Sequence, residues 1–203
     1  MKTQSRQLSV LGLTFLLFAS ACAAPSAPTP TPTPSPLDLA KAFGDADHQR
    51  DIEGVMALFT DDIQWNFAFN VQGRKLVRNV LEYSYGLNDQ RTYSDCALAV
   101  GVVTCQVVQH GDCQPAGVDG EIRFEFTGEK ISKINGSYFD DITVIGAKAF
   151  PWARENLPQD FAKNRDEEWA QFGGNGEPAG KLTPRELGQL IGMFCTKYVE
   201  ATK

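Results

Sequence analysis

Four strand-like runs follow one another between residues 92 and 139, and they constrain the fold more than any other feature of the chain. In the third run, apolar residues alternate with Arg123 and Glu125, the period of two that a strand with one buried face shows. Short turns at residues 100–101 and 127–129 separate neighbouring runs, so we predict antiparallel hairpins. The four runs cover residues 92–99, 102–109, 120–126 and 130–139.

Three helical segments precede this predicted meander. Their apolar residues recur with a helical period, and Asp51 is placed to cap the second helix. One further strand lies between the second and third helices, with Ile63, Trp65, Phe67 and Phe69 on one face. Helices followed by an antiparallel meander indicate an α+β fold. The predicted helices cover residues 37–48, 52–59 and 73–85.

The C-terminal part, from residue 143, has a different character. It contains short helical patterns around Trp152 and Trp169, and a glycine-rich break at residues 172–178. A final helix begins at Thr183-Pro184, with Glu186 completing a capping box. We expect the two tryptophans to fasten a helical extension to the sheet, with a lid over a pocket as the alternative.

The N-terminus is a targeting segment rather than part of the fold. Lys2 and Arg6 precede an apolar run at residues 8–18, and Ala19-Ser20-Ala21 stands directly before Cys22. This pattern resembles the bacterial lipoprotein signal, which implies cleavage before Cys22 and a lipid anchor (diacylglycerol and palmitate) on it. The alternative is an ordinary secretory signal with an A-x-A-like cleavage site.

Six prolines alternate with small residues between residues 23 and 36. Proline fixes φ and removes a hydrogen-bond donor, so we predict an extended tether of about 3.1 Å per residue, roughly 40 Å in all. The chain then divides into a signal peptide (1–21), the lipidated cysteine and tether (22–36), a sheet-and-helix domain (37–142) and a helical extension (143–203).

The charge balance bears on the partners. The chain has 19 Lys and Arg against 25 Asp and Glu, a net charge of −6, and both basic residues of the leader lie outside the folded part. An acidic body argues against nucleic acid and against electrostatic adhesion to anionic lipid. We therefore expect attachment to a cell membrane or outer membrane through Cys22, with the body facing the extracytoplasmic space.

Four cysteines remain after Cys22, an even number that suits an oxidising compartment. If residues 100–101 form the hairpin turn, Cys96 faces Cys105 across the two strands, where a disulfide fits. Cys113 and Cys195 then remain, and their bond would join a loop to the last helix. The alternative is free buried thiols.

The segment DIEGVMALFTDDIQW, between two helices, and the later GEKI hairpin resemble the SnoaL-like, nuclear transport factor 2-like superfamily. The resemblance covers residues 38–140. It implies a curved antiparallel sheet that wraps about three helices into a cone, with a pocket at the wide end. It does not extend to the residues after 140.

The steroid-isomerase branch of this family uses an aspartate base with tyrosine and protonated aspartate donors. Matching the motif places the base at Phe67, the tyrosine at Phe43 and the acidic donor near Ile122, all apolar here. The resemblance therefore does not extend to that mechanism. We expect the pocket wall to contain Phe43, Trp65, Phe67 and Phe124, with the alternative of a plain core; Asn66 faces away, and Asp61 and Asp62 are solvated.

Other catalytic signatures are weak. The sequence has no Ser-x-Gly elbow, P-loop or dinucleotide-binding glycine motif. His110, Asp112 and Cys113 form a thin metal-ligand pattern, but a disulfide is the better use of Cys113, and His48 stands alone. We predict neither a metal nor a cofactor, and we expect Asp140 and Asp141 to lie in a solvated turn.

These features together predict a tethered, non-catalytic protein that binds an apolar small molecule or a protein partner in the cone. A lyase, isomerase or hydrolase acting on a hydrophobic molecule, with an acid such as Asp140, is the alternative. A third reading is a structural module that forms a homodimer through the sheet face.

Overall fold

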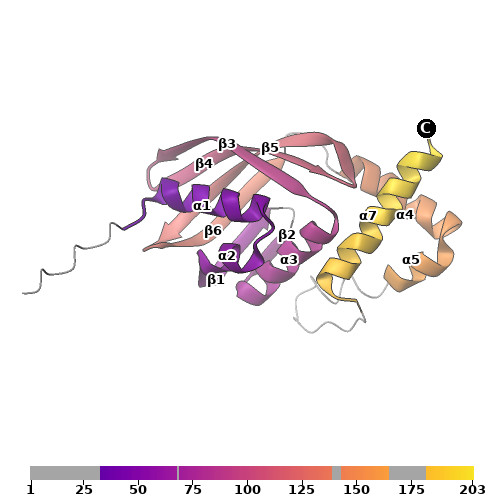
Figure 1. The fold of residues 1–203 in the computed structure, drawn as a ribbon, viewed down its shortest axis with the longest axis horizontal. Helices are drawn as coiled ribbons and strands as arrows, with labels where there is room; N and C mark the ends of the chain where they lie inside the picture. Colours follow the sequence, from indigo (N-terminus) through magenta and orange to yellow (C-terminus); the bar gives the residue numbers. More distant parts are fainter. Residues whose placement is uncertain (1–32, 68, 139–142, 165–181) are drawn as a thin grey trace, which may run out of the picture. The chain divides into compact units, whose positions relative to one another are not determined.

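The computed structural model describes residues 33–67, 69–138, 143–164 and 182–203, all within one unit of the chain, residues 33–203. The fold is α+β, as predicted, and its strands form one curved six-stranded sheet in the order β2-β1-β6-β5-β4-β3 (Figure 1). The strands are β1 (Phe59–Phe67), β2 (Phe69–Gln72), β3 (Gln90–Ala99), β4 (Val102–Gly111), β5 (Gln114–Thr127) and β6 (Lys130–Tyr138).

The four strands of the meander lie close to their predicted ranges. Ala99 pairs with Val102 and Thr127 with Lys130, so the turns fall where the sequence placed them. The strand between the second and third helices, β1, differs from the prediction. It pairs with β6 in parallel, whereas we expected an antiparallel sheet throughout. A tight turn forces neighbouring strands to be antiparallel, but β1 and β6 are far apart in the chain and no turn sets their direction.

Strand β2 corrects a second expectation. We placed Phe69 on the same strand face as Trp65 and Phe67, but the chain reverses there and Phe69 pairs with Phe67 across a hairpin. Phe69 is therefore only partly buried, and its ring stands at 90° to that of Tyr83, with centroids 5.7 Å apart. The alternation of apolar residues continues from β1 into β2, so the sequence pattern does not reveal that the chain reverses between them.

Six helices are described: α1 (Pro36–His48), α2 (Ile52–Ala57), α3 (Arg74–Gly86), α4 (Thr143–Asn156), α5 (Pro158–Asn164) and α7 (Pro184–Ala201). The Asp51 cap is confirmed, since Asp51 Oδ1 accepts from the Gly54 N–H at 3.0 Å. The capping box at Thr183 and Glu186 is also confirmed. Ser35 and Asp38 form a further box at the start of α1.

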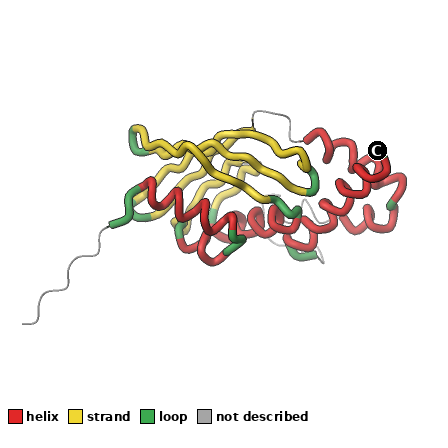
Figure 2. The backbone as a smooth tube through the Cα atoms, turned by 45° about the horizontal axis from the view of Figure 1, so that its top comes forward, coloured by secondary structure: helices red, strands yellow, loops and turns green. Residues whose placement is uncertain are grey.

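Helices α1, α2 and α3 cover one face of the curved sheet (Figures 1 and 2). The main core lies between these helices and the sheet. The ring centroid of Phe43 lies 5.2–6.4 Å from those of Phe59, Trp65 and Phe124. Burial of these rings is the main source of stability for this layer.

A second hydrophobic cluster joins the C-terminal helices to the rest of the unit. Helix α7 crosses α3 so closely that a Cβ at Gly188 would lie 2.1 Å from the Tyr83 carbonyl oxygen. Trp152 packs against Tyr198 of α7, with ring centroids 6.1 Å apart, so it fastens the extension's own helices together. Trp169 lies outside the described residues.

Both predicted cysteine pairs are disulfides in the structure. Cys96–Cys105 links β3 to β4, and Cys113–Cys195 ties the β4–β5 turn to α7. Two disulfides are typical of a protein that folds outside the cytoplasm. None of the helices in the described ranges is long and apolar enough to cross a membrane.

Candidate functional site

A cavity of about 370 Å³ lies where the sheet, α3 and the C-terminal helices meet. Most of its wall is apolar. Trp65 and Phe67 of β1 and Val80 of α3 contribute from one side, and Phe150 of α4 and Ile191 of α7 contribute from the other. Helices α4 and α7, both in the extension after residue 142, therefore form part of the cavity wall.

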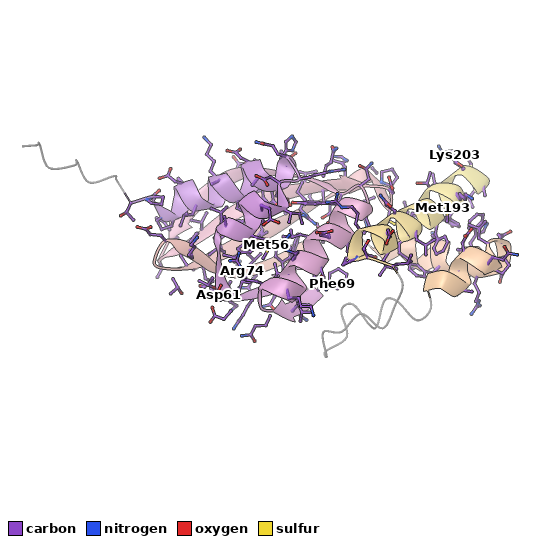
Figure 3. All side chains as sticks on the ribbon, turned by 60° about the horizontal axis from the view of Figure 1, so that its bottom comes forward. Met56, Asp61, Phe69, Arg74, Met193 and Lys203 are labelled. Carbon is purple, nitrogen blue, oxygen red and sulfur yellow. A yellow bond between two sulfur atoms is a disulfide. The ribbon has the colours of Figure 1, made fainter. Side chains whose placement is uncertain are left out.

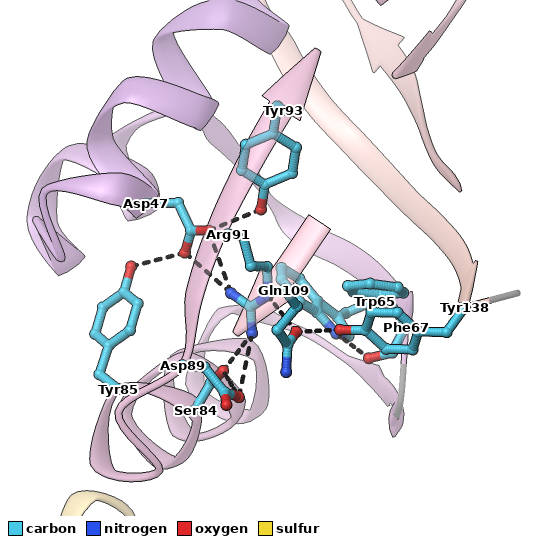
Figure 4. A network of polar contacts seen from close by, with 10 residues as sticks. All are labelled: Asp47, Trp65, Phe67, Ser84, Tyr85, Asp89, Arg91, Tyr93, Gln109 and Tyr138. Atoms are coloured by element: carbon cyan, nitrogen blue, oxygen red, sulfur yellow. Dashed lines mark hydrogen bonds and ion pairs between the residues drawn. The ribbon is translucent and has the colours of Figure 1, made fainter. Parts of the chain in front are cut away.

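One end of the cavity is polar. Its side chains are Ser84, Asp89, Arg91, Gln109 and Tyr138, which come from α3, the α3–β3 turn, β3, β4 and β6 (Figure 4). All except Tyr138 are buried. Five elements thus converge on a polar group in a mostly apolar cavity, whose lining also includes Gln114.

Arg91 is the centre of this polar group. It is 5% exposed, and its NH1 donates to both oxygens of Asp47, at 3.1 and 3.2 Å. Tyr85 and Tyr93 donate their hydroxyls to the same carboxylate at 3.0 and 2.7 Å. Four hydrogen bonds to one buried carboxylate fix both partners in place.

The electrostatics of this pair follow from its burial. Burial alone lowers the pKa of Arg91, but the carboxylate of Asp47 together with Tyr93, Tyr138 and Asp89 outweighs burial, and the pKa is raised well above the ordinary value. Burial and the same carboxylate raise the pKa of Tyr93. Arg91 is thus a permanent cation and Tyr93 a neutral donor.

Two further contacts of Arg91 reach the cavity. Its Nε donates to Gln109 Oε1 at 3.0 Å, and its NH2 donates to Ser84 Oγ. Tyr138 donates to the same Gln109 oxygen, and burial raises the pKa of Tyr138 to about 12. The guanidinium thereby orients the side chains that line the polar end.

Asp89 stands apart within this group. Its Oδ2 accepts from Ser84 Oγ at 2.7 Å and lies 4.0 Å from Arg91 NH2. No described residue donates to its other oxygen, Oδ1. Burial raises the pKa of Asp89 to about 6, against the opposing effects of Arg91 and Ser84. Asp89 can therefore exchange a proton near neutral pH.

The four predicted pocket residues divide into two pairs. Trp65 and Phe67 line the cavity. Phe43 and Phe124 are fully buried in the main core, in edge contact at 5.2 Å, and do not line it. The two positions matched to the isomerase base and tyrosine, Phe67 and Phe43, hold no proton-transfer group, yet Asp89 supplies one from another strand end.

The other candidates lie outside the cavity. Asp61 and Asp62 are exposed within β1, and Asp61 Oδ1 is 3.9 Å from Arg74 Nε on the surface (Figure 3). Asn66 is hydrogen-bonded to Asn135 at 3.0 Å and is not part of the wall. Asp140 and Asp141 lie outside the described residues.

The described residues hold no group of three His, Cys, Asp and Glu side chains placed for a metal ion. Cys113 of the thin H-x-D-C pattern is in the disulfide with Cys195. The ring of His110 lies instead against Gly117, where a Cβ would be 2.5 Å from it.

Sequence reasoning missed Asp47, Asp89 and Arg91. A signal existed for two of them. Asp47 follows Phe43 by one helical turn and so shares its inward face, and Arg91 shares a strand face with Tyr93. A charge inside an apolar stripe at each of two elements indicates a buried pair.

Comparisons with known proteins give similarity of structure alone. No protein-family model matches the chain, and no curated protein matches it. An NTF2-like protein of unknown function from Cytophaga hutchinsonii is 11% identical, covering 55% of this chain and 94% of its own (TM-score 0.46).

Two other solved structures are similar over a comparable share of the chain. A protein with a ketosteroid isomerase-like fold from Catenulispora acidiphila, in complex with trimethylamine, is 18% identical over 49% of this chain and 84% of its own (TM-score 0.44). The epoxide hydrolase/cyclase-like enzyme SalBIII of salinomycin pyran-ring formation is 11% identical over 50% and 88% (TM-score 0.46).

Proposed function

We propose that the protein binds a small amphipathic molecule in the cavity between the sheet and the C-terminal helices. The observation that carries this proposal is the division of the cavity into a long apolar wall and one polar end. Ligand sites in proteins typically have this composition, with a few placed polar groups that orient the ligand. The volume of about 370 Å³ lies near the lower end of the usual range for ligand pockets, which suits a small molecule.

The polar end restricts the ligand's own polar group. Arg91 is neutralised by Asp47, and its NH1, NH2 and Nε all donate to side chains around it. Within the polar group around Arg91, Asp89 Oδ1 is a buried acceptor to which no described residue donates, and it can accept while Asp89 is ionised. A hydroxyl, an amide N–H or a protonated amine would satisfy it, whereas a carboxylate would be repelled.

The protein's placement is part of the proposal. Its supports are the leader that resembles a lipoprotein signal, the tether after Cys22 and the two disulfides. A lipid on Cys22 would hold the cavity outside the cytoplasm, within reach of a membrane. A homodimer through the sheet face stays a prediction.

An enzyme is the second candidate, and Asp89 favours it. A carboxyl with its pKa raised to about 6, one oxygen to which no described residue donates and a place in the cavity lining can act as a general acid or base. In this reading the Oδ1 atom takes a proton from the bound molecule and returns it at another atom.

The first experiment is native mass spectrometry of the full chain, produced in an oxidising host, before and after gentle organic extraction. A mass excess that extraction removes supports binding and identifies the ligand's class. Gly146 provides the matched control, because it lines the cavity and a Cβ there would meet no described heavy atom within 4 Å.

The two substitutions at Gly146 have opposite consequences for the cavity. Gly146→Phe fills it and should abolish the adduct, while Gly146→Ala keeps the space and should retain it. An adduct that survives in Gly146→Phe would place the ligand elsewhere and overturn the proposal. Turnover of the identified ligand that is lost in Asp89→Asn, with binding retained, would favour the enzyme.

A further inference from the structure

Three large apolar side chains are exposed among the described residues: Leu37 (41% exposed), Leu98 (49%) and Val100 (103%). Leu98 and Val100 belong to the tip of the β3–β4 hairpin, residues 97–101, which reads Ala-Leu-Ala-Val-Gly and is exposed throughout. Single exposed apolar residues need no explanation, but here all three of the large ones gather in one region.

The turn itself does not account for Val100. Val100 and Gly101 have φ of 49° and 77°, a two-residue turn with both central residues in the left-handed region. Asn, Asp and Gly are favoured in such a turn, and a β-branched residue is disfavoured there by its Cβ. The position therefore combines a backbone cost with full exposure of an apolar side chain.

The hairpin tip lies at the end of the fold where the N-terminal segment joins it. Leu37, in the first turn of α1, lines a groove together with Ser94 and Cys96 of β3. The β3–β4 turn and the start of α1 share one end of the sheet, with α7 at the other (Figures 1 and 2). The chain that leads back to Cys22 thus joins the fold beside the apolar tip.

We propose that residues 97–101 insert into the interface of a lipid bilayer, a contact that rests on the membrane anchoring proposed above. The tip carries no charge, so it pays no desolvation penalty for an ion. The chain as a whole is acidic, with a formal charge of −6, so the apolar contact favours a zwitterionic surface over an anionic one.

The anchor makes a small contact effective. Because α1 begins at Pro36, the tether covers residues 23–35, and a polyproline-like tether of this length would reach roughly 40 Å at about 3.1 Å per residue. Tethering at this range gives a millimolar-order effective concentration of tip at the surface. Burial of one valine side chain then shifts the occupancy of the contact by about tenfold.

The test places a fluorescent reporter at the tip. Val100→Trp is compared with Glu129→Trp, an exposed position in the neighbouring β5–β6 turn. The full chain, with Cys22→Ser, is held on phosphatidylcholine vesicles through an N-terminal histidine tag and a nickel-chelating lipid, so that the result does not depend on lipidation. The emission of the added tryptophan is obtained by subtracting the spectrum of the chain that lacks it. Both spectra are recorded with and without doxyl-labelled lipid in the vesicles.

The expected result is a blue-shifted emission from residue 100 that doxyl lipid quenches, with no change at residue 129. Solvent-like, unquenched emission at residue 100 overturns the proposal, and so does equal quenching at both positions. A blue shift at residue 100 that grows with protein concentration without vesicles also overturns it, in favour of contact with a second copy. Failure of lipidation at Cys22, read separately by mass, would affect the anchor alone.

The retention of the anchored protein provides a second measurement. Val100→Asn introduces a residue that the turn prefers and removes the apolar side chain. Release of the tagged chain from vesicles should become about tenfold faster, while the control Glu129→Gln should leave it unchanged. An unchanged release rate in Val100→Asn contradicts the insertion of the tip.

Discussion

Removing the charge of Asp47 is the sharpest test of how the polar end is built. In Asp47→Asn, the side chain keeps its shape, but the guanidinium of Arg91 loses the carboxylate that accepts two of its hydrogen bonds, at 3.1 and 3.2 Å. Both residues are at most 5% exposed. The nearest remaining anion is Asp89, whose Oδ2 is 4.0 Å from Arg91 NH2.

The expected cost follows from this geometry. Breaking a buried ion pair from one side costs about 3–5 kcal/mol. Arg91→Met should cost a similar amount, reduced by the two tyrosine hydroxyls that continue to stabilise the carboxylate of Asp47. The double variant removes both partners of this pair, so its cost should be smaller than the sum by about 2–3 kcal/mol.

The assay is urea unfolding at neutral pH with both disulfides intact, followed by tryptophan fluorescence and near-ultraviolet circular dichroism. A domain of this size has about 5–15 kcal/mol of stability, so the single variants should still fold. Equal slopes against urea would show that the compared states are the same. A cost below about 1 kcal/mol for Asp47→Asn, or costs that simply add in the double variant, would refute the buried pair.

Three further predictions concern the cavity and its closure. The pKa of Asp89 rises from 3.8 to about 6 on folding, so between these pH values the folded state binds more protons than the unfolded state. The free energy of unfolding should therefore fall by about 3 kcal/mol as the pH rises through this range. Urea unfolding at a pH below and a pH above the range should show that Asp89→Asn removes this fall. Gly188→Ala should loosen α7 by about 1–3 kcal/mol, seen as faster amide exchange in α7, whereas Gly146→Ala should not. The disulfide Cys113–Cys195 closes a loop of 82 residues, and Cys96–Cys105 closes one of 9. Replacing the first pair by alanines should therefore cost roughly 2 kcal/mol more stability than replacing the second.

Local signals accounted for most of the fold. Caps such as Asp51 and Thr183 are read from a few adjacent residues, and a two-residue turn sets the register of Ala99 against Val102. The cross-strand disulfide followed from that register. The parallel pairing of β1 with β6 could not be read in this way, because it depends on how distant segments pack.

The candidate site was predictable only in its apolar part. Trp65 and Phe67 stand in a strand pattern that marks an inward face, and both line the cavity. Asp47 and Arg91 are 44 positions apart, so the charge on each inward face indicates burial but does not identify its partner. The packing of α1 on β3 brings them together, and α4 and α7 supply part of the wall of the cavity that Asp89 lines.

The arrangement of charges explains why the pKa of Asp89 lies near neutral pH and why this residue should control the pH dependence of binding. Asp47 pairs with Arg91 from the side of α1, with two direct hydrogen bonds, while Arg91 NH2 lies 4.0 Å from Asp89 Oδ2 and lowers the pKa of Asp89. Burial then outweighs the attraction of Arg91 and raises the pKa of Asp89 to about 6.

An ionised Asp89 accepts hydrogen bonds from a ligand, and a protonated one donates. Binding of a donor such as an amine should therefore weaken as pH falls below about 6, while binding of a ligand that presents only a carbonyl should strengthen. Calorimetry of the two ligand types at pH values on either side of 6 would decide this, and an equal pH response of both, or one retained in Asp89→Asn, would show that another group controls the site.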